Sequence, residues 1–149
     1  MANEGVFPKS NGDIGYASDF NRINLLNATQ RLTNTQDSTV STSYVDTSTT
    51  ITLTGLDSAE TYDIYAIVSG YTKSNVATGV FKLVIGSTDI CEAPQGDSSE
   101  IISISGILKG QTGITSITAK LQFKALTGTL IWGDTSNIIN SISIVAFPQ

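Results

Sequence analysis

Three groups of acidic residues are the first candidates for chemistry in this chain: Asp57 and Glu60, Asp97 and Glu100, and Asp134. Two carboxyl groups about 5–10 Å apart in a cleft can hydrolyse a glycosidic bond. All of these acids, however, stand in turn-like stretches, where carboxylates are normally solvated. The same oxygen-rich loops suit calcium, but no Asp-x-Asp-x-Asp spacing supports such a site. We therefore expect neither a catalytic carboxylate pair nor a metal site.

Nucleophilic catalysis has equally little support. The chain has no histidine, which excludes a Ser-His-Asp triad and its cysteine variant. The single cysteine, Cys91, stands in a strand-like stretch, where a thiol usually behaves as a small apolar residue. Residues 110–113 are typical of a hairpin turn rather than a phosphate-binding loop, because no helix with a lysine follows them. The sequence predicts a protein that is not an enzyme and needs no cofactor.

Length and composition limit the remaining classes. The 149 residues suffice for one domain with an appendage, and a hydrophobic content of 40% supports a real core. A net charge of -5 with scattered basic residues gives no footprint for nucleic acid. No stretch approaches the roughly 18 apolar residues of a spanning helix, so no membrane insertion is expected. The start MANEGVFPKS lacks the basic-then-apolar order of a secretory signal.

The N-terminal residues differ in kind from the rest. Residues 1–17 combine glycine, proline and polar residues and are expected to form an extended anchoring arm. Residues 18–37 are assigned to a short helix and a polar linker, because Ser18 is a suitable N-cap and apolar residues recur at helical spacing up to Leu32. Such a helix is marginal alone in water. It needs its own copies, a groove on another protein or its own β-domain, and Leu25 and Leu32 are the residues expected between subunits.

From residue 38 onward the pattern predicts an antiparallel, jelly-roll-like sandwich of about 8–9 strands, an all-β fold. Segments rich in β-branched and aromatic residues are separated by short turn-forming stretches, without the helical connections of βαβ units. The expected strands are 42–46, 48–55, 61–70, 78–86, 88–92, 100–107, 114–126, 128–132 and 138–147.

Some of these strands are apolar on both faces. In 114–126, apolar and polar residues alternate, as expected when one face is dry and the other wet. In 61–70 and 138–147 both alternating sets contain large apolar residues, so a second surface must cover the face that the core does not. A neighbouring subunit in a closed cyclic assembly is the simplest cover. The residues expected at this seam are Tyr65, Ile67, Val145 and Phe147, and the pattern leaves open which face is inner.

Two aromatic residues beside predicted loops, Tyr71 and Trp132, are candidate contacts for a sugar ring. Loops of a rigid sandwich commonly carry binding residues. For Trp132 the sequence favours the edge of the core or a subunit contact over a sugar contact.

Several segments resemble those of tailed-virus structural proteins. YASDFNRI, at residues 16–23, is similar to a short segment near the start of tail and head fibres. STSYVDTSTTITLTG, YDIYAIVSG and GVFKLVIGS resemble the first strands of the small jelly-roll domain of phage fibres, and TGTLIWGDTSNIINSISIVAF resembles its last two. The resemblance implies a homotrimer similar to tumour-necrosis-factor-like sandwiches. It also implies docking to the particle through the N-terminal segment, at Tyr16, Asp19, Phe20, Asn21 and Ile23.

The stem is short for a host-attachment fibre, so the resemblance implies a stubby head fibre or capsid decoration protein on the virion surface. Its partners would be a capsid or tail protein of the same virion and a host-surface glycan. The alternative is a tail-associated receptor-binding tip, in which the loops after Gly70 and around Trp132 bind glycan.

Overall fold

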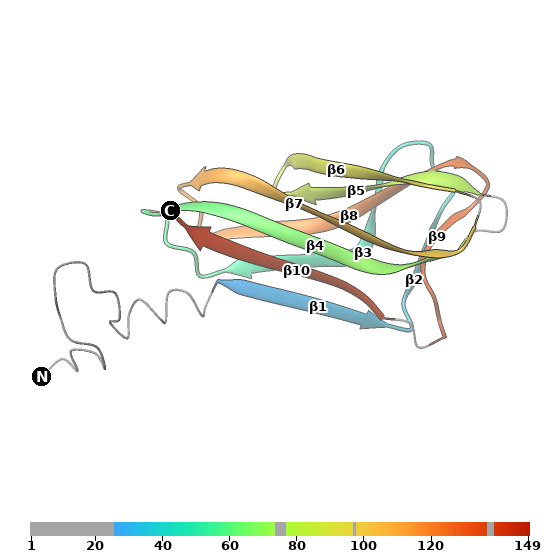
Figure 1. Cartoon of the computed structure of the whole chain (residues 1–149), viewed down its shortest axis with the longest axis horizontal. Coiled ribbons are helices and arrows are strands. Elements are labelled where there is room, and N and C mark those ends of the chain that lie inside the picture. Colours follow the sequence, from blue (N-terminus) through green and yellow to red (C-terminus); the bar gives the residue numbers. More distant parts are fainter. Residues whose placement is uncertain (1–25, 74–76, 97, 137–138) are drawn as a thin grey trace, which may run out of the picture.

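The structure is a computed structural model that describes residues 26–73, 77–96, 98–136 and 139–149. Within these ranges the chain forms ten β-strands in two sheets that pack face to face (Figure 1). All strand pairs are antiparallel, so the predicted all-β antiparallel sandwich is confirmed. No helix in the described part of the chain is long and apolar enough to cross a membrane.

The two sheets differ in size, and we call them sheet A and sheet B. Sheet A has six strands. Four of them lie side by side in the order β1 (Asn27–Thr33), β10 (Ile139–Pro148), β4 (Thr61–Lys73) and β7 (Glu100–Thr112). The short strand β9 (Leu130–Gly133) pairs with the end of β4, and the short strand β2 (Gln36–Thr39) pairs with β9. Sheet B has four strands in the order β3 (Val45–Thr54), β8 (Ser116–Thr127), β5 (Thr78–Ile85) and β6 (Thr88–Gln95).

The strand order is that of a jelly roll. With the two short strands β2 and β9 set aside, sheet A runs β1-β10-β4-β7 and sheet B runs β3-β8-β5-β6. The first strand therefore pairs with the last, and the chain crosses repeatedly between the sheets, as in other double Greek-key sandwiches.

The core lies between the sheets and is built by alternation along each strand. In β4, Tyr62, Ile64, Ala66 and Val68 are buried and their odd-numbered neighbours point outward. In β8, Lys120, Gln122 and Lys124 point outward, while the apolar residues between them are buried. The ring of Phe81 at the centre lies 6.0 Å from that of Phe123 and 5.3 Å from that of Trp132.

The helix predicted within residues 18–37 is wrong where the structure describes it, because residues 27–33 form strand β1. Along β1 the exposed residues alternate with the half-buried Ala28, Gln30 and Leu32, which is the two-residue period of a strand. All seven residues pair with β10, and Thr29 Oγ1 shares a hydrogen bond of 2.9 Å with Ser143 Oγ. Pairing with the last strand thus overrides a helical spacing that is only local.

The predicted linker is also part of the sandwich. Residues 36–39 form β2, and the carboxylate of Asp37 accepts hydrogen bonds from the Ser48 amide at 2.9 Å and the Ser48 hydroxyl at 2.7 Å. The boundary predicted at residue 38 is therefore too late. The predicted arm, residues 1–17, and the start of the predicted helix lie outside the described residues.

Candidate functional site

A group of apolar side chains lies on the outer face of sheet A, away from the core. Ile67, Ile107 and Phe147 are 36%, 44% and 51% exposed, and Tyr65 and Val145 are half-buried. Strand register explains the grouping, since Val145 lies opposite Tyr65 and Tyr65 lies opposite Ile107 across β10, β4 and β7. Ile67 and Phe147 belong to the adjacent rows. We call these five residues the apolar patch.

Hydroxyl groups rather than charges continue this surface along the sheet. Ile67 lies between Ser143 and Ser105, and the next outward row contains Ser141, Ser69 and Ser103. The nearest carboxylate, Asp63, lies opposite Phe147 and accepts a hydrogen bond from the Gly110 amide at 2.9 Å. Small hydroxyl side chains cost less to remove from water than charges do. The outer face of sheet A between Asp63 and Arg31, which lies opposite Ser141, therefore suits burial against another surface.

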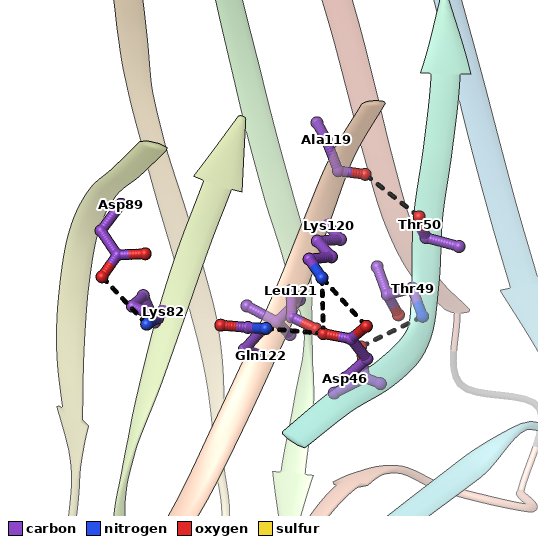
Figure 2. Close-up of polar contacts among 10 residues, drawn as sticks. Asp46, Thr49, Thr50, Lys82, Asp89, Ala119, Lys120, Leu121 and Gln122 are labelled. Carbon is purple, nitrogen blue, oxygen red and sulfur yellow. Dashed lines mark hydrogen bonds and ion pairs between the residues drawn. The ribbon is translucent and has the colours of Figure 1, made fainter. Parts of the chain in front are cut away.

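The outer face of sheet B carries charges instead. Lys82 Nζ lies 3.0 Å from Asp89 Oδ2, and Lys120 Nζ lies 2.9 Å from Asp46 Oδ1 (Figure 2). Gln122 Nε2 donates to Asp46 Oδ1 at 2.6 Å. The hydrogen bonds from Gln122 and Lys120 hold the pKa of Asp46 below its ordinary value.

Tyr44 lies over the middle of this charged face. Its hydroxyl donates to Glu92 Oε1 at 2.6 Å, and the Nζ atoms of Lys82 and Lys124 lie 3.9 and 4.4 Å from the centre of its ring. Burial, followed by the hydrogen bond to Glu92, raises the pKa of Tyr44 well above its ordinary value. The two lysines thus interact with the Tyr44 ring, and the Tyr44 hydroxyl is hydrogen-bonded to Glu92, all within one chain. The charged groups named here therefore have their partners within the chain.

The four seam residues predicted on the strands, Tyr65, Ile67, Val145 and Phe147, lie together on the outer face of sheet A. Leu32 does not join them, because it lies opposite the buried Asn140 on the core side of sheet A. Leu25 and the predicted docking residues lie outside the described residues; the latter are Tyr16, Asp19, Phe20, Asn21 and Ile23.

Ile107 belongs to the patch but was missing from the predicted seam. The signal was present, because isoleucines occupy both alternating sets of residues 100–108. Only the pairing of β7 with β4 places Ile107 beside Tyr65.

Trp132 lies in the core and is not available as the candidate sugar contact, because it is only 1% exposed. The indole packs against Phe81, and Nε1 donates to Thr49 Oγ1 at 2.8 Å. A Cβ atom at Gly70 would collide with the indole, so glycine at that position makes the burial possible. Tyr71 is half-buried on the outer face of sheet A, opposite Ile101 on β7.

The candidate chemical groups do not converge. Asp57 is exposed in a turn, where its carboxylate accepts a hydrogen bond from the Ala59 amide at 2.9 Å. Asp134 accepts one from the Ser136 hydroxyl at 3.3 Å, and Asp97 lies outside the described residues. Burial raises the pKa of the Cys91 thiol. Within the described ranges, no three His, Cys, Asp or Glu side chains gather where they could hold a metal ion.

Comparison with known proteins yields only distant similarities. No protein-family model and no curated protein matches the chain. A structure of infectious bursal disease virus, Gx strain, is similar with a TM-score of 0.42 and 14% identity, over 82% of this chain and 32% of that one. The insecticidal delta-endotoxin Cry8Ea1 from Bacillus thuringiensis is similar with a TM-score of 0.38 and 12% identity, over 78% of this chain and 19% of that one.

The carbohydrate-binding module CBM36 is similar with a TM-score of 0.29 and 17% identity, over 79% of this chain and 99% of that one. The chain spans about a third of the viral protein and about a fifth of the toxin. These TM-scores and identities are too low to carry an argument about family or function.

Proposed function

We propose that this chain is a virion structural protein, a trimeric head fibre or capsid decoration protein at the virion surface. Three copies assemble through the outer face of sheet A, and the N-terminal segment docks them to a capsid or tail protein. The assembled protein also aids adhesion to host-surface glycan. It is not an enzyme, in keeping with a sequence that lacks histidine.

The apolar patch is the observation that carries this proposal. Burying one large apolar side chain completely contributes about 1.5–3 kcal/mol, and five such side chains lie together on one face. The outer face of sheet B, by contrast, has its charges paired within the chain. The sandwich therefore has one side suited to subunits and one side suited to water.

A closed three-fold ring is supported by two arguments. Ring closure covers the patch on every copy and leaves no copy able to recruit further chains without limit. The resemblance of residues 16–23 and of the strand segments to phage fibres implies that the ring has three subunits.

The position of Leu26, where the described part of the chain begins, supports docking at one end of the assembly. Leu26 is buried, and its carbonyl accepts a hydrogen bond of 2.8 Å from the amide of Ala146, next to Phe147. The described chain thus begins at the same end of the sandwich as the patch.

The alternative, a receptor-binding tip, is less well supported. It places glycan binding in the loops after Gly70 and around Trp132, with Tyr71 and Trp132 as candidate contacts, and Trp132 is in the core. Tyr71 alone does not make a sugar-binding surface.

The test is the mass of the full chain in solution and of two lysine variants. We expect three times the 15.7 kDa of one chain, or a multiple of that trimer. Phe147→Lys should abolish the trimer, because it places a charge in the buried seam. Thr52→Lys adds the same charge to the outer face of sheet B, where Thr52 is exposed, and should leave the trimer intact.

Sedimentation equilibrium measures all three chains. A wild-type chain without three-fold assembly, or equal effects of the two substitutions, contradicts the proposed seam.

A further inference from the structure

Strand β7 is the long free edge of sheet A. Among the described residues it pairs with β4 on one side and with no strand on the other. Residues 100–108 pair with residues 64–72 without interruption, and an irregularity of register follows. On its outward side, Ile101 is 77% exposed and Ile107 is 44% exposed.

The other edge strands carry the devices that prevent edge-to-edge pairing, which are charges, proline, bulges and short length. These are Asp89, Glu92 and Pro94 on β6, Asp46 and a bulge on β3, Arg31 on β1, and Asp37 on the four-residue β2. Residues 101–108 of β7 read IISISGIL and contain neither a charge nor a proline. Between residues 101 and 108 the edge of β7 therefore lacks these devices, with Glu100 before this stretch and Lys109 and the irregularity of register after it.

The backbone of β7 has groups available at this edge. The carbonyl of Ser105 accepts a hydrogen bond from Cys91 Sγ at 3.4 Å, so it does not point to β4. In an antiparallel ladder, alternate residues direct both their amide and their carbonyl to the same neighbour. Ile101, Ser103, Ser105 and Ile107 therefore direct their amides and carbonyls away from β4. Of these groups, the Ser105 carbonyl already accepts the hydrogen bond from Cys91 on β6, which a pairing strand would have to displace.

We propose that β7 pairs with β7 of a second copy of this chain, antiparallel, around a two-fold axis at Ile104. The pairing joins two copies of sheet A into one continuous sheet. A two-fold contact needs only one self-complementary surface on the chain. This inference rests on the edge of sheet A, so it is independent of the three-fold seam, although Ile107 lies at both.

Two requirements select the register. Inner faces must stay on the same side of the joined sheet, so odd-numbered residues lie opposite odd-numbered residues. The regular stretch 100–108 is centred on Ile104, so a two-fold axis there uses all of it and avoids the irregularity that follows. Ile101 then lies opposite the second copy's Ile107, and Ser103 lies opposite its Ser105. The two exposed large apolar side chains of the strand then cover each other.

Charge pairs at residues 103 and 105 test this register, because both serines are exposed. In S103K/S105K, like charges lie directly opposite each other at two symmetric positions. In S103K/S105E, each lysine lies opposite a glutamate of the other copy. Cross-strand charge pairs have modest energies, so we expect the two variants to differ by about tenfold or more in dimer dissociation constant. A register shifted by two residues would instead place like charges opposite each other in S103K/S105E.

The experiment uses the full chain carrying Phe147→Lys, which is designed to remove the three-fold seam. Sedimentation equilibrium should find a dimer for the F147K chain, a monomer when S103K/S105K is added, and a dimer again with S103K/S105E. An F147K chain that is monomeric at submillimolar concentration overturns the inference, even where the wild-type chain is a trimer. Association that is the same in all three chains overturns it too.

Hydrogen exchange supplies a second readout that does not depend on mass. The amides of residues 101, 103, 105 and 107 should be protected in the dimer and exchange rapidly in S103K/S105K. The amides of residues 102, 104 and 106, directed to β4, should stay protected in both and report an intact fold. Rapid exchange at the odd-numbered residues in the F147K chain overturns the inference.

Discussion

At the scale of single residues, Trp132 shows how one buried hydrogen bond ties the two sheets together. Its Nε1 donates to Thr49 Oγ1 on β3, so sheet A is joined to sheet B through the core. Both groups are fully buried, where an unpaired polar atom costs roughly 1–3 kcal/mol. The indole therefore stabilises the sandwich by packing and by satisfying Thr49.

We predict that Trp132→Phe lowers the free energy of unfolding by about 1–3 kcal/mol, because it leaves a small cavity and an unpaired hydroxyl. Urea denaturation followed by circular dichroism measures the change. The double variant W132F/T49V removes both partners, so its loss should be smaller than the sum of the two single losses. Strictly additive losses would show that the hydrogen bond contributes nothing.

The sequence around Trp132 could not reveal this role. A tryptophan before Gly133 and Asp134 resembles a residue at the start of an exposed turn. Its partner Thr49 lies 83 residues earlier in the chain, in a run of serines and threonines without a distinguishing pattern. Only the closure of the two sheets brings the pair together.

At the scale of elements, alternation predicted much of what matters for the candidate interface. It separated Tyr65 and Ile67 from Ile64, Ala66 and Val68 correctly. It could not say which set is inner, because alternation along one strand is symmetric. That choice depends on which side of sheet A faces sheet B, and hence on the whole topology.

The same limit explains the error at β1. Helical spacing in residues 18–32 is a local signal, whereas the partner of β1 is the last strand of the chain. Pairing across such a separation leaves no mark on the segment itself. Its period-two pattern is weak, because Gln30 occupies one of the inward positions.

We predict that β1 is needed for the sandwich. A chain of residues 26–149 should unfold at nearly the same temperature as the full chain. A chain of residues 34–149 loses the ladder to β10 and the burial of Leu26, so its midpoint should fall by at least about 10 °C. Differential scanning calorimetry compares the three chains, and similar midpoints would mean that β1 is dispensable.

At the scale of the whole molecule, the two outer faces of the sandwich differ in chemistry. Charges on sheet B are satisfied inside the chain, and apolar residues on sheet A are not covered by its described part. Subunits that meet through sheet A would present sheet B to solvent. This arrangement places lysines, aspartates and Tyr44 on the exterior of the assembly.

Deletion of residues 1–17 should abolish incorporation into the particle while leaving the sandwich folded, because β1 begins at Asn27. Particles assembled with the shortened chain and purified by density gradient are compared with those carrying the full chain, with the mass of the free protein as a check of assembly. Normal incorporation of the shortened chain would show that docking does not use this segment.

The pairing of the first strand with the last has a consequence for biosynthesis. While the chain is being made on the ribosome, β1 has no strand to pair with until β10 (Ile139–Pro148) has been made. Non-local pairing of this kind is slow, and it requires the earlier strands to wait with their edges open. We expect sheet A to close only once β10 has left the ribosome, so that assembly of subunits waits for the last strand of the sandwich.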